Sequence, residues 1–312
     1  MKKFLPVLCL LLAGIVWGQE TAADVLNRGV SYYENKEYTR AIEAFTRAIA
    51  LDSKYALAYG NRAFCYYLLE DYAKAAADYN QAISLDPNNA DYYFYRGHTH
   101  YYGGNYERAL ADYTQVLKME PDDYSSYMYR SFVYYDMGNF TMSLEDLSRA
   151  ISVNPEVEWG FEKRGHLYYE MKDFDKAIAD YSQMIKINPK NPNSYYFRGN
   201  AYLEKEDYNR AIADFTQTLK LDSKMVTGYN NRGWAYFLKK DYNKAIADYT
   251  AGLKLDPASS LLYWNRGYAY AEKKDFKKAI SDMEKALELN PENDNLRQHL
   301  AEIRQLQQQA KK

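Results

Sequence analysis

The chain repeats a 34-residue pattern eight times between Ala22 and Asn293. A period of this length is typical of a solenoid, in which each unit buries its apolar face only by stacking on its neighbours. The eight predicted repeats span residues 22–55, 56–89, 90–123, 124–157, 158–191, 192–225, 226–259 and 260–293. Positions are numbered from 1 to 34 within each repeat.

Every repeat carries two apolar stripes with helical spacing. The first stripe occupies positions 4, 8 and 11, as in Tyr229, Gly233 and Tyr236. The second occupies positions 17, 20, 24 and 27, as in Tyr242, Ala245, Tyr249 and Gly252. Each set lies on one face of a helix, so the pattern predicts two helices per repeat.

Turn and cap residues mark the ends of these helices. Gly104 and Gly138 stand between the two helices of the third and fourth repeats. Position 16 is predicted to cap the second helix, and seven repeats have Asp or Asn there: Asp71, Asn105, Asn139, Asp173, Asp207, Asp241 and Asp275. Proline disfavours a helical residue before it, so the second helix is predicted to end ahead of the proline at position 32. Six repeats carry it: Pro87, Pro121, Pro155, Pro189, Pro257 and Pro291.

Residues 1–18 have the pattern of an export signal. Lys2 and Lys3 precede an uncharged run that ends at Trp17, and the small residue Gly18 precedes the predicted cleavage before Gln19. The run is short for a membrane span, and an uncleaved anchor is the alternative. We therefore expect an exported protein, periplasmic or secreted, without stable membrane insertion after cleavage. Cys9 lacks the preceding small residue of a lipoprotein signal, so no lipidation is predicted.

Removal of the signal takes away two lysines and no acidic residue, which moves the net charge from −2 to about −4. This balance argues against nucleic acid as a partner, because such binding depends on neutralising phosphates. Cys65 is then the remaining cysteine, which excludes an intrachain disulfide. A lone cysteine inside a helical pattern is predicted to be a small buried apolar residue.

The repeat resembles the tetratricopeptide repeat. The resemblance rests on small residues at positions 8, 20 and 27, aromatic residues at 4, 11, 17 and 24, and proline at 32. It covers residues 22–293 and implies an all-α fold, a right-handed α-α superhelical solenoid of eight helix-turn-helix repeats. Residues 294–312 are predicted to add a C-terminal capping helix and tail, with the helix from about Asp294 to Ala310.

Position 7 departs from the commonest family pattern, because all eight repeats have arginine there in place of leucine: Arg28, Arg62, Arg96, Arg130, Arg164, Arg198, Arg232 and Arg266. A hairpin that turns near position 15 places position 7 opposite position 23. Position 23 is aspartate in seven repeats, with Ala44 as the exception: Asp78, Asp112, Asp146, Asp180, Asp214, Asp248 and Asp282. We predict forked Arg–Asp pairs. The alternative is an arginine ladder for phosphate or carboxylate groups.

The sequence contains no recognisable catalytic motif. His98 and His166 share position 9 in different repeats, and neighbouring helices about 8–10 Å apart keep them from one metal ion. No Cys/His cluster, phosphate-binding glycine loop or nucleophile elbow is present. We therefore predict a protein that is not an enzyme and holds no cofactor or metal.

In tetratricopeptide proteins, positions 2, 5, 6, 9, 12 and 13 of the first helix line a concave groove, and the resemblance implies the same here. Positions 6 and 9 supply the candidate partner-binding residues: Asn27, Asn61, Phe64, Tyr95, His98, Tyr129, Phe132, His166, Phe197, Asn231, Trp234, Asn265 and Tyr268. So many aromatic side chains on one surface indicate an interaction site. The tyrosines at position 12 either line this groove or pack against the adjacent helix.

These features predict an exported scaffold or adaptor that binds an extended peptide segment of a partner protein in the aromatic groove. In some family members, asparagines at position 6 hold the peptide backbone. The first alternative is carbohydrate or cell-wall binding through the same groove, since sugars stack on aromatic rings. The second is a non-catalytic subunit of an enzyme complex.

Overall fold

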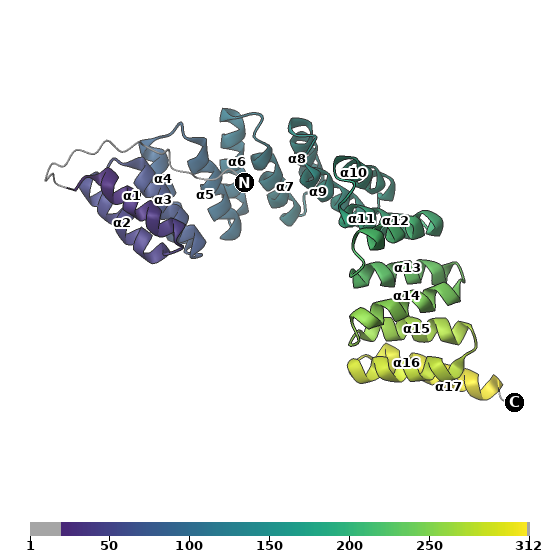
Figure 1. Cartoon of the computed structure of the whole chain (residues 1–312). Coiled ribbons are helices and arrows are strands. Elements are labelled where there is room, and N and C mark those ends of the chain that lie inside the picture. The colour runs from purple at the N-terminus through teal and green to yellow at the C-terminus, as the bar shows by residue number, and fades with distance from the viewer. Residues whose placement is uncertain (1–19, 311–312) are drawn as a thin grey trace. The chain divides into compact units, whose positions relative to one another are not determined.

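The computed structural model describes residues 20–310, so the predicted signal segment and Cys9 lie outside it. The described residues form seventeen α-helices and no strand. Each odd-numbered helix from α1 to α15 packs against the helix that follows it (Figure 1). The predicted all-α solenoid of paired helices is therefore confirmed.

The helices form two compact units, and the chain passes from the first to the second between Pro155 and Glu156. The first unit contains α1 (Ala22–Glu34), α2 (Tyr38–Leu51), α3 (Ala56–Leu68), α4 (Tyr72–Leu85), α5 (Ala90–Tyr102), α6 (Tyr106–Met119), α7 (Tyr124–Asp136) and α8 (Phe140–Val153). The second contains α9 (Glu158–Glu170), α10 (Phe174–Ile187), α11 (Pro192–Glu204), α12 (Tyr208–Leu221), α13 (Val226–Leu238), α14 (Tyr242–Leu255), α15 (Ser260–Glu272), α16 (Phe276–Leu289) and α17 (Asp294–Ala310).

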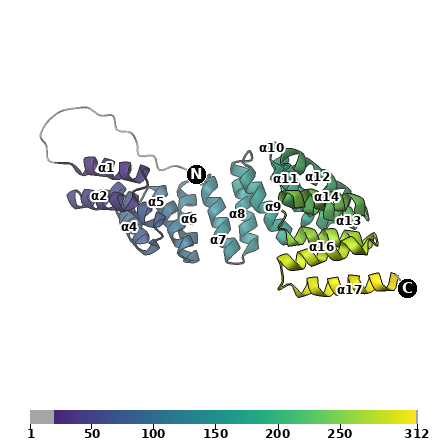
Figure 2. The same ribbon diagram turned by 60° about the horizontal axis from the view of Figure 1, so that its bottom comes forward.

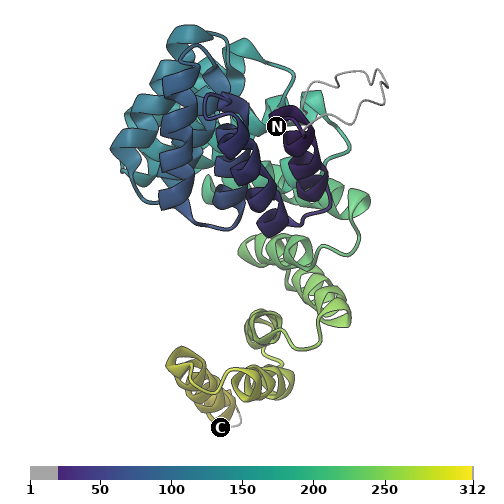
Figure 3. The same cartoon turned by 90° about the vertical axis from the view of Figure 1, so that its left-hand side faces the viewer.

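Within each unit, every even-numbered helix also packs against the next odd-numbered one, so the pairs stack in chain order. The purple helices α1 and α2 form the first of these pairs (Figure 3). At the end of the second unit, α17 lies beside α16 (Figure 2) and buries Leu296, Leu300 and Ile303. An apolar edge of the last repeat is thereby covered, as a capping helix requires.

A left-handed residue separates the two helices of every repeat. Position 15 has a φ near +60° to +75° in all eight, with glycine only at Gly104 and Gly138. The other six repeats place a long charged side chain there: Lys36, Glu70, Lys172, Glu206, Lys240 and Lys274. A side chain in this region is strained by its own Cβ atom, so six turns hold a residue that glycine would replace with less strain.

Replacing Lys240 with glycine should therefore stabilise the second unit by about 0.5–1 kcal/mol, because glycine adopts positive φ without the steric penalty. Lys239, the preceding residue, has a φ of −78° and offers the matched control. Lys239→Gly should destabilise the second unit, because glycine raises the conformational entropy of the unfolded chain and relieves no backbone strain in the folded one. Urea unfolding of both variants tests the pair, and equal shifts of the midpoint would contradict a strained turn at Lys240.

The predicted caps of the even-numbered helices are present with one exception. The side chain at position 16 accepts a hydrogen bond from the backbone three residues on in six repeats: Asp71, Asn139, Asp173, Asp207, Asp241 and Asp275. Asn105 does not cap α6, because its side-chain amide donates to the Gly103 carbonyl at 3.1 Å. The even-numbered helices end one residue before each Asp/Asn/Glu-Pro pair, as predicted.

The predicted stripe of the odd-numbered helices is buried at position 8 in every repeat, but at position 4 only in Val25 and Phe161 and at position 11 only in His100. In α13, Gly228 and Ala235 at positions 3 and 10 are buried, whereas Tyr229 and Tyr236 are half-buried. These helices pack against two even-numbered neighbours, so their buried face is turned toward the preceding repeat. Position 8 must be small, since a Cβ atom on Gly233 would lie 2.7 Å from the Tyr249 ring. The stripe of the even-numbered helices is buried at positions 20, 24 and 27.

Candidate functional site

The arginines at position 7 are held by the fold. In the seven repeats with Asp at position 23, Nε donates to Oδ2 at 2.6–2.9 Å and Nη2 donates to Oδ1 at 2.6–2.8 Å. The predicted forked pairs are therefore confirmed. Arg28, which faces Ala44, pairs instead with Glu20 at 2.6 Å.

A third bond ties these arginines to the preceding repeat. In six of them Nη1 donates to a side chain at position 25 of the preceding even-numbered helix, at 2.6–3.2 Å. In the seven repeats with an Arg–Asp pair, the guanidinium also lies over the aromatic ring at position 4, as Arg232 lies 5.8 Å from the Tyr229 ring centre. With carboxylate, hydroxyl and ring contacts made inside the fold, these side chains do not form a ladder for phosphate or carboxylate ligands.

In the first unit, the aromatic candidate residues at positions 6 and 9 form a continuous line of ring contacts. Phe64 packs edge-on against Tyr95 with ring centres 5.1 Å apart, and Tyr129 packs edge-on against Phe132 at 5.7 Å. His98 joins the two pairs, since its ring centre lies 5.9 Å from Tyr95 and 4.1 Å from Tyr129. All but His98 are half-buried and keep part of their surface in water. The line is thus an amphipathic aromatic surface.

His98 was predicted to face a partner, and the structure corrects this. Its side chain is buried, with the residue 7% exposed. The Nδ1 atom lies 3.0 Å from both the Phe94 carbonyl and the Tyr113 hydroxyl. Burial lowers the pKa of His98 to about 4, so the ring is neutral at pH 7. Its role is to support the aromatic surface from beneath, because its ring fills the space between α5 and α7.

In the second unit, the candidate residues form three separate clusters. His166 packs edge-on against Phe197 at 4.5 Å, and burial lowers the pKa of this histidine. Trp234 stacks on Phe237, with ring planes 8° apart and centres at 5.1 Å. Tyr268 contacts Trp264 and His299, the latter from the capping helix. All candidate residues of this unit are half-buried.

Between these clusters, four asparagines form a hydrogen-bonded chain of side-chain amides. Asn265 donates to Asn230 at 2.8 Å, Asn230 donates to Asn231 at 2.9 Å, and Asn231 donates to Asn200 at 2.8 Å. Asn231 also donates to the Tyr196 hydroxyl at 3.1 Å. The sequence analysis predicted the asparagines at position 6 but not Asn230. The neighbouring asparagine Asn231 was the feature from which Asn230 could have been predicted. At the other end of the array, Asn27 is exposed and Asn61 is half-buried.

Tyrosines at position 12 connect neighbouring repeats. The Tyr101 hydroxyl donates to Asp136 at 2.6 Å, and the Tyr169 hydroxyl donates to Glu204 at 3.4 Å. Both acceptors stand at position 13 of the next repeat. For these two tyrosines, the alternative of packing against the adjacent odd-numbered helix is correct.

Metal-ligating residues do not gather anywhere in residues 20–310: no three His, Cys, Asp or Glu side chains lie close enough to share an ion. Cys65 is buried as a free thiol, in agreement with its predicted packing role. Among the described helices, none combines the length and the apolar character needed to cross a membrane.

Family models match most of the chain. A model described as tetratricopeptide repeat matches residues 26–55, 56–89, 192–225 and 226–259, and a second with the same description matches 90–123 and 260–293. A third, described as TPR repeat, matches 165–205. No curated protein matches the chain.

Solved structures share the fold at low identity. The C-terminal part of a TPR repeat-containing protein from Cytophaga hutchinsonii is 20% identical, with a TM-score of 0.70 over 77% of this chain and 98% of that one. A tetratricopeptide repeat protein from Parabacteroides merdae is 16% identical, with a TM-score of 0.51 over 90% and 98%. YrrB, described as a TPR protein with an unusual peptide-binding site, is 16% identical, with a TM-score of 0.52 over 61% and 97%.

Proposed function

Because the chain belongs to the tetratricopeptide-repeat family, we propose that it is a non-catalytic scaffold that binds an extended segment of a partner protein along its odd-numbered helices. Proteins of this family generally act as scaffolds and bind protein or peptide partners. One structurally similar protein is described as having a peptide-binding site. The proposal places the peptide on the surface formed by positions 6 and 9.

The amide chain of the second unit is the observation that carries this proposal. Each asparagine side chain has two donor hydrogens and an oxygen that accepts two bonds. Within the amide chain, three of the four side-chain oxygens each accept one hydrogen bond. The Asn265 oxygen and the Asn200 amide hydrogens, at the two ends of the chain, are not used by it. Because neighbouring side chains fix the amides, a peptide backbone would meet oriented donors and acceptors at little cost in entropy.

Aromatic side chains flank this polar strip and would supply the apolar contacts. Trp234 lies one turn along α13 from Asn231, and Tyr268 lies one turn along α15 from Asn265. Both are half-buried and rest on a neighbouring ring. Rigid aromatic anchors beside fixed polar groups are typical of protein interfaces. We infer that the preferred peptide alternates apolar side chains with exposed backbone amides.

Trp234→Ala should weaken peptide binding at least about fivefold, because aromatic anchors at interfaces commonly contribute more than about 1 kcal/mol. The change should destabilise the fold by less than the roughly 3–5 kcal/mol of a core truncation, since Trp234 keeps exposed surface. Leu255→Ala removes a 44% exposed side chain at the end of α14 and is the matched control. Peptides selected from a random library give the ligand, and titration calorimetry with thermal unfolding gives both quantities.

A loss of stability with unchanged affinity for the folded fraction would place Trp234 in the core and contradict the proposed groove. Parallel screening on a glycan array distinguishes the carbohydrate alternative, which uses the same aromatic faces. Binding of glycans without any selected peptide would replace the peptide proposal by the carbohydrate one. The enzyme-subunit alternative predicts that a partner protein recovered by affinity capture carries catalytic activity.

We also propose that the scaffold acts outside the cytoplasm, on the sequence pattern of residues 1–18. Lys2 and Lys3 before an apolar run, followed by Gly18, are the features that support export. Expression of the whole chain with its native start should yield a mature protein whose first residue is at or close to Gln19. N-terminal sequencing of the exported fraction measures this directly, and an intact Met1 in the membrane fraction would favour a retained anchor.

A further inference from the structure

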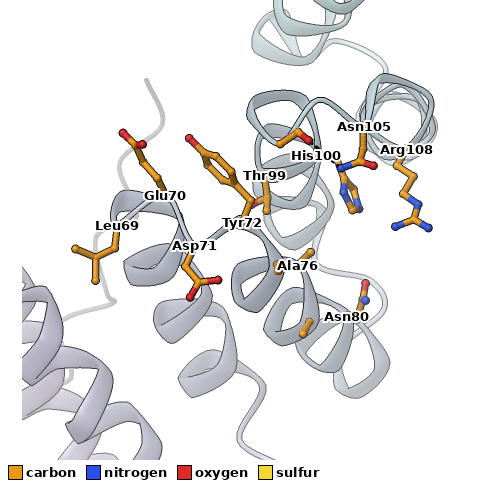
Figure 4. Close-up of a pocket in the computed structure, with 13 residues that line it drawn as sticks. Leu69, Glu70, Asp71, Tyr72, Ala76, Asn80, Thr99, His100, Asn105 and Arg108 are labelled. Atoms are coloured by element: carbon orange, nitrogen blue, oxygen red, sulfur yellow. Dashed lines mark hydrogen bonds between the residues drawn. The ribbon is translucent and has the colours of Figure 1, made fainter.

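A pocket of about 890 Å³ opens in the first unit between α4, α5 and α6, where two residues depart from the pattern of all other repeats (Figure 4). Position 21 is Ile or Leu in seven repeats but alanine at Ala76. Position 11 is tyrosine in seven repeats but histidine at His100. Both residues line the pocket. Both side chains are smaller than those at the same positions of the other repeats, and the pocket is larger than the one of about 350 Å³ at the equivalent place in the sixth and seventh repeats.

His100 and Asn105 together leave the Arg108 side chain without the partners that position 19 has in other repeats. In five repeats the Lys or Arg at position 19 pairs with Asp at position 16 and lies over the tyrosine at position 11. In the third repeat these partners are Asn105 and His100, which offer neither a carboxylate nor a phenol ring. Within residues 20–310, the Arg108 side chain has no ion pair, hydrogen bond or ring contact, and it lines the pocket.

The start of α6 lacks its cap at the same place. The Asn105 side chain turns to the Gly103 carbonyl, so the Arg108 backbone amide does not receive the side-chain oxygen that this amide receives in six other repeats. An uncapped first turn of a fourteen-residue helix presents amide hydrogens and the positive end of the helix dipole. The Arg108 guanidinium and the first turn of α6 together favour the binding of a negatively charged group.

A buried polar side chain faces the same space. His100 is 8% exposed and makes no hydrogen bond to any described residue. Its Nε2 atom lies 3.9 Å from Oδ2 of Asp112, and that carboxylate is already held by Arg96. The ring nitrogens of His100 are not sealed from solvent, so a ligand that enters the pocket can reach them. A ligand oxygen in the pocket would supply a hydrogen-bond partner.

We propose that this pocket binds a carboxylate with an apolar body. The carboxylate would lie beside Arg108, the first turn of α6 and His100, and the body would rest on Ala73, Ala76 and Ala77. Glu70 and Asp71 line the opposite side of the pocket and would repel a dianion such as phosphate monoester (Figure 4). The volume is in the range of small-molecule sites. The pocket shares no residue with the candidate groove, so this proposal does not depend on the proposed function.

Titration of the whole chain with 4-methylpentanoate, followed by amide NMR shifts in α6, tests the proposal. The neutral 4-methylpentanamide has the same body and should bind at least tenfold more weakly. Ala76→Ile introduces the larger side chain found at this position in other repeats. Asn105→Asp should restore the cap of α6 and give Arg108 an ion-pair partner. Each should weaken carboxylate binding at least tenfold. Asn139→Asp makes the same chemical change one repeat along and should leave binding unchanged.

Both pocket variants restore the pattern of the other repeats, so their thermal midpoints should equal or exceed that of the original chain. Arg108→Met provides a third variant that leaves the cavity and cap unchanged. Absence of binding at 50 mM carboxylate, or equal binding of the amide, would overturn the proposal. Binding that survives Ala76→Ile and Arg108→Met would overturn it as well. N-acetyl-leucine in a parallel titration distinguishes sources: tighter binding than 4-methylpentanoate indicates a peptide C-terminus, and weaker binding indicates a free acid.

Discussion

Replacing Asp214 with alanine should destabilise the second unit by about 3–5 kcal/mol, the loss expected when one partner of a buried ion pair is removed. Arg198 donates to both carboxylate oxygens of Asp214, from Nε and from Nη2, at 2.8 Å each. The side chains of Arg198 and Asp214 are 21% and 8% exposed, so water can replace the lost partner only in part. An unpaired guanidinium would remain between two repeats.

Arg198 makes a third hydrogen bond, and because of it the loss of stability should extend beyond one repeat. Nη1 donates to the Ser182 hydroxyl at 3.1 Å, on the even-numbered helix of the preceding repeat. The pair therefore holds α10, α11 and α12 in one register. Solenoids unfold through the interfaces between repeats, so weakening this contact should loosen both neighbours. Amide hydrogen exchange in these helices measures the local free energy, since repeat arrays depart from two-state unfolding.

A double-mutant cycle of Arg198→Met and Asp214→Ala should show a coupling of at least about 1–2 kcal/mol, above the scatter of about 0.3–0.5 kcal/mol for independent sites. Asp207 and Arg210 form the control cycle, because they also pair but Arg210 is 66% exposed. Exposed pairs contribute about 0–1 kcal/mol. Additive losses at Arg198 and Asp214 would mean that the arginine column is not structural, and would return it to the candidates for ligand binding.

The Arg–Asp pairs were predictable because both members belong to one repeat. A hairpin that turns at position 15 fixes which positions face each other, whatever lies outside the repeat. The contacts that were not predicted cross between repeats: the Arg198–Ser182 bond, the burial of Gly228 and the bond from Asn265 to Asn230. Their geometry depends on the angle at which one repeat stacks on the next, and the 34-residue period does not encode that angle.

In the candidate site, too, features set within one repeat were predictable, and features set by the neighbouring repeat were not. Positions 6 and 9 were placed on a half-buried surface correctly for Phe64 and Trp234, because the helical period decides which side of the helix they occupy. His98 occupies the same position yet is buried, since Tyr129 of the next repeat covers its ring at 4.1 Å. The identity of the neighbour, rather than the position number, decides whether a side chain at position 9 reaches water.

Burial of His98 leads to the second large effect: the first unit should lose stability in mild acid. The pKa of His98 is lowered to about 4 in the folded protein, because burial disfavours the imidazolium ion, whereas the unfolded chain has the ordinary value of about 6.5. Between these values the unfolded chain binds a proton that the folded chain excludes. Stability therefore falls as the pH falls from 6.5 to 4, by about 3 kcal/mol in all, and this contribution stays constant outside that window.

The surroundings of the ring offer no charge that would oppose this effect. Phe94, Tyr95, Tyr113 and Tyr129 surround the imidazole, and none of them is ionised below pH 7. An imidazolium ion would keep the hydrogen bond from Nδ1 to the Phe94 carbonyl but would have no carboxylate partner in contact with it. Desolvation without compensation is the condition under which a histidine stays neutral and resists protonation.

Comparison of the original chain with His98→Phe isolates this contribution. Phenylalanine stands at the same position in the second and fourth repeats, at Phe64 and Phe132, so the substitution suits the array. The variant loses the contact to the Tyr113 hydroxyl, which changes stability by the same amount at every pH. His100 titrates in both proteins, so its effect cancels in the difference. Hydrogen exchange in α5 and α6 at pH 7 and pH 4.5 should show an acid loss about 2–3 kcal/mol smaller in the variant. Equal acid losses in the two proteins would mean that His98 is protonated in the folded state, and that the aromatic surface above it opens to water in mild acid.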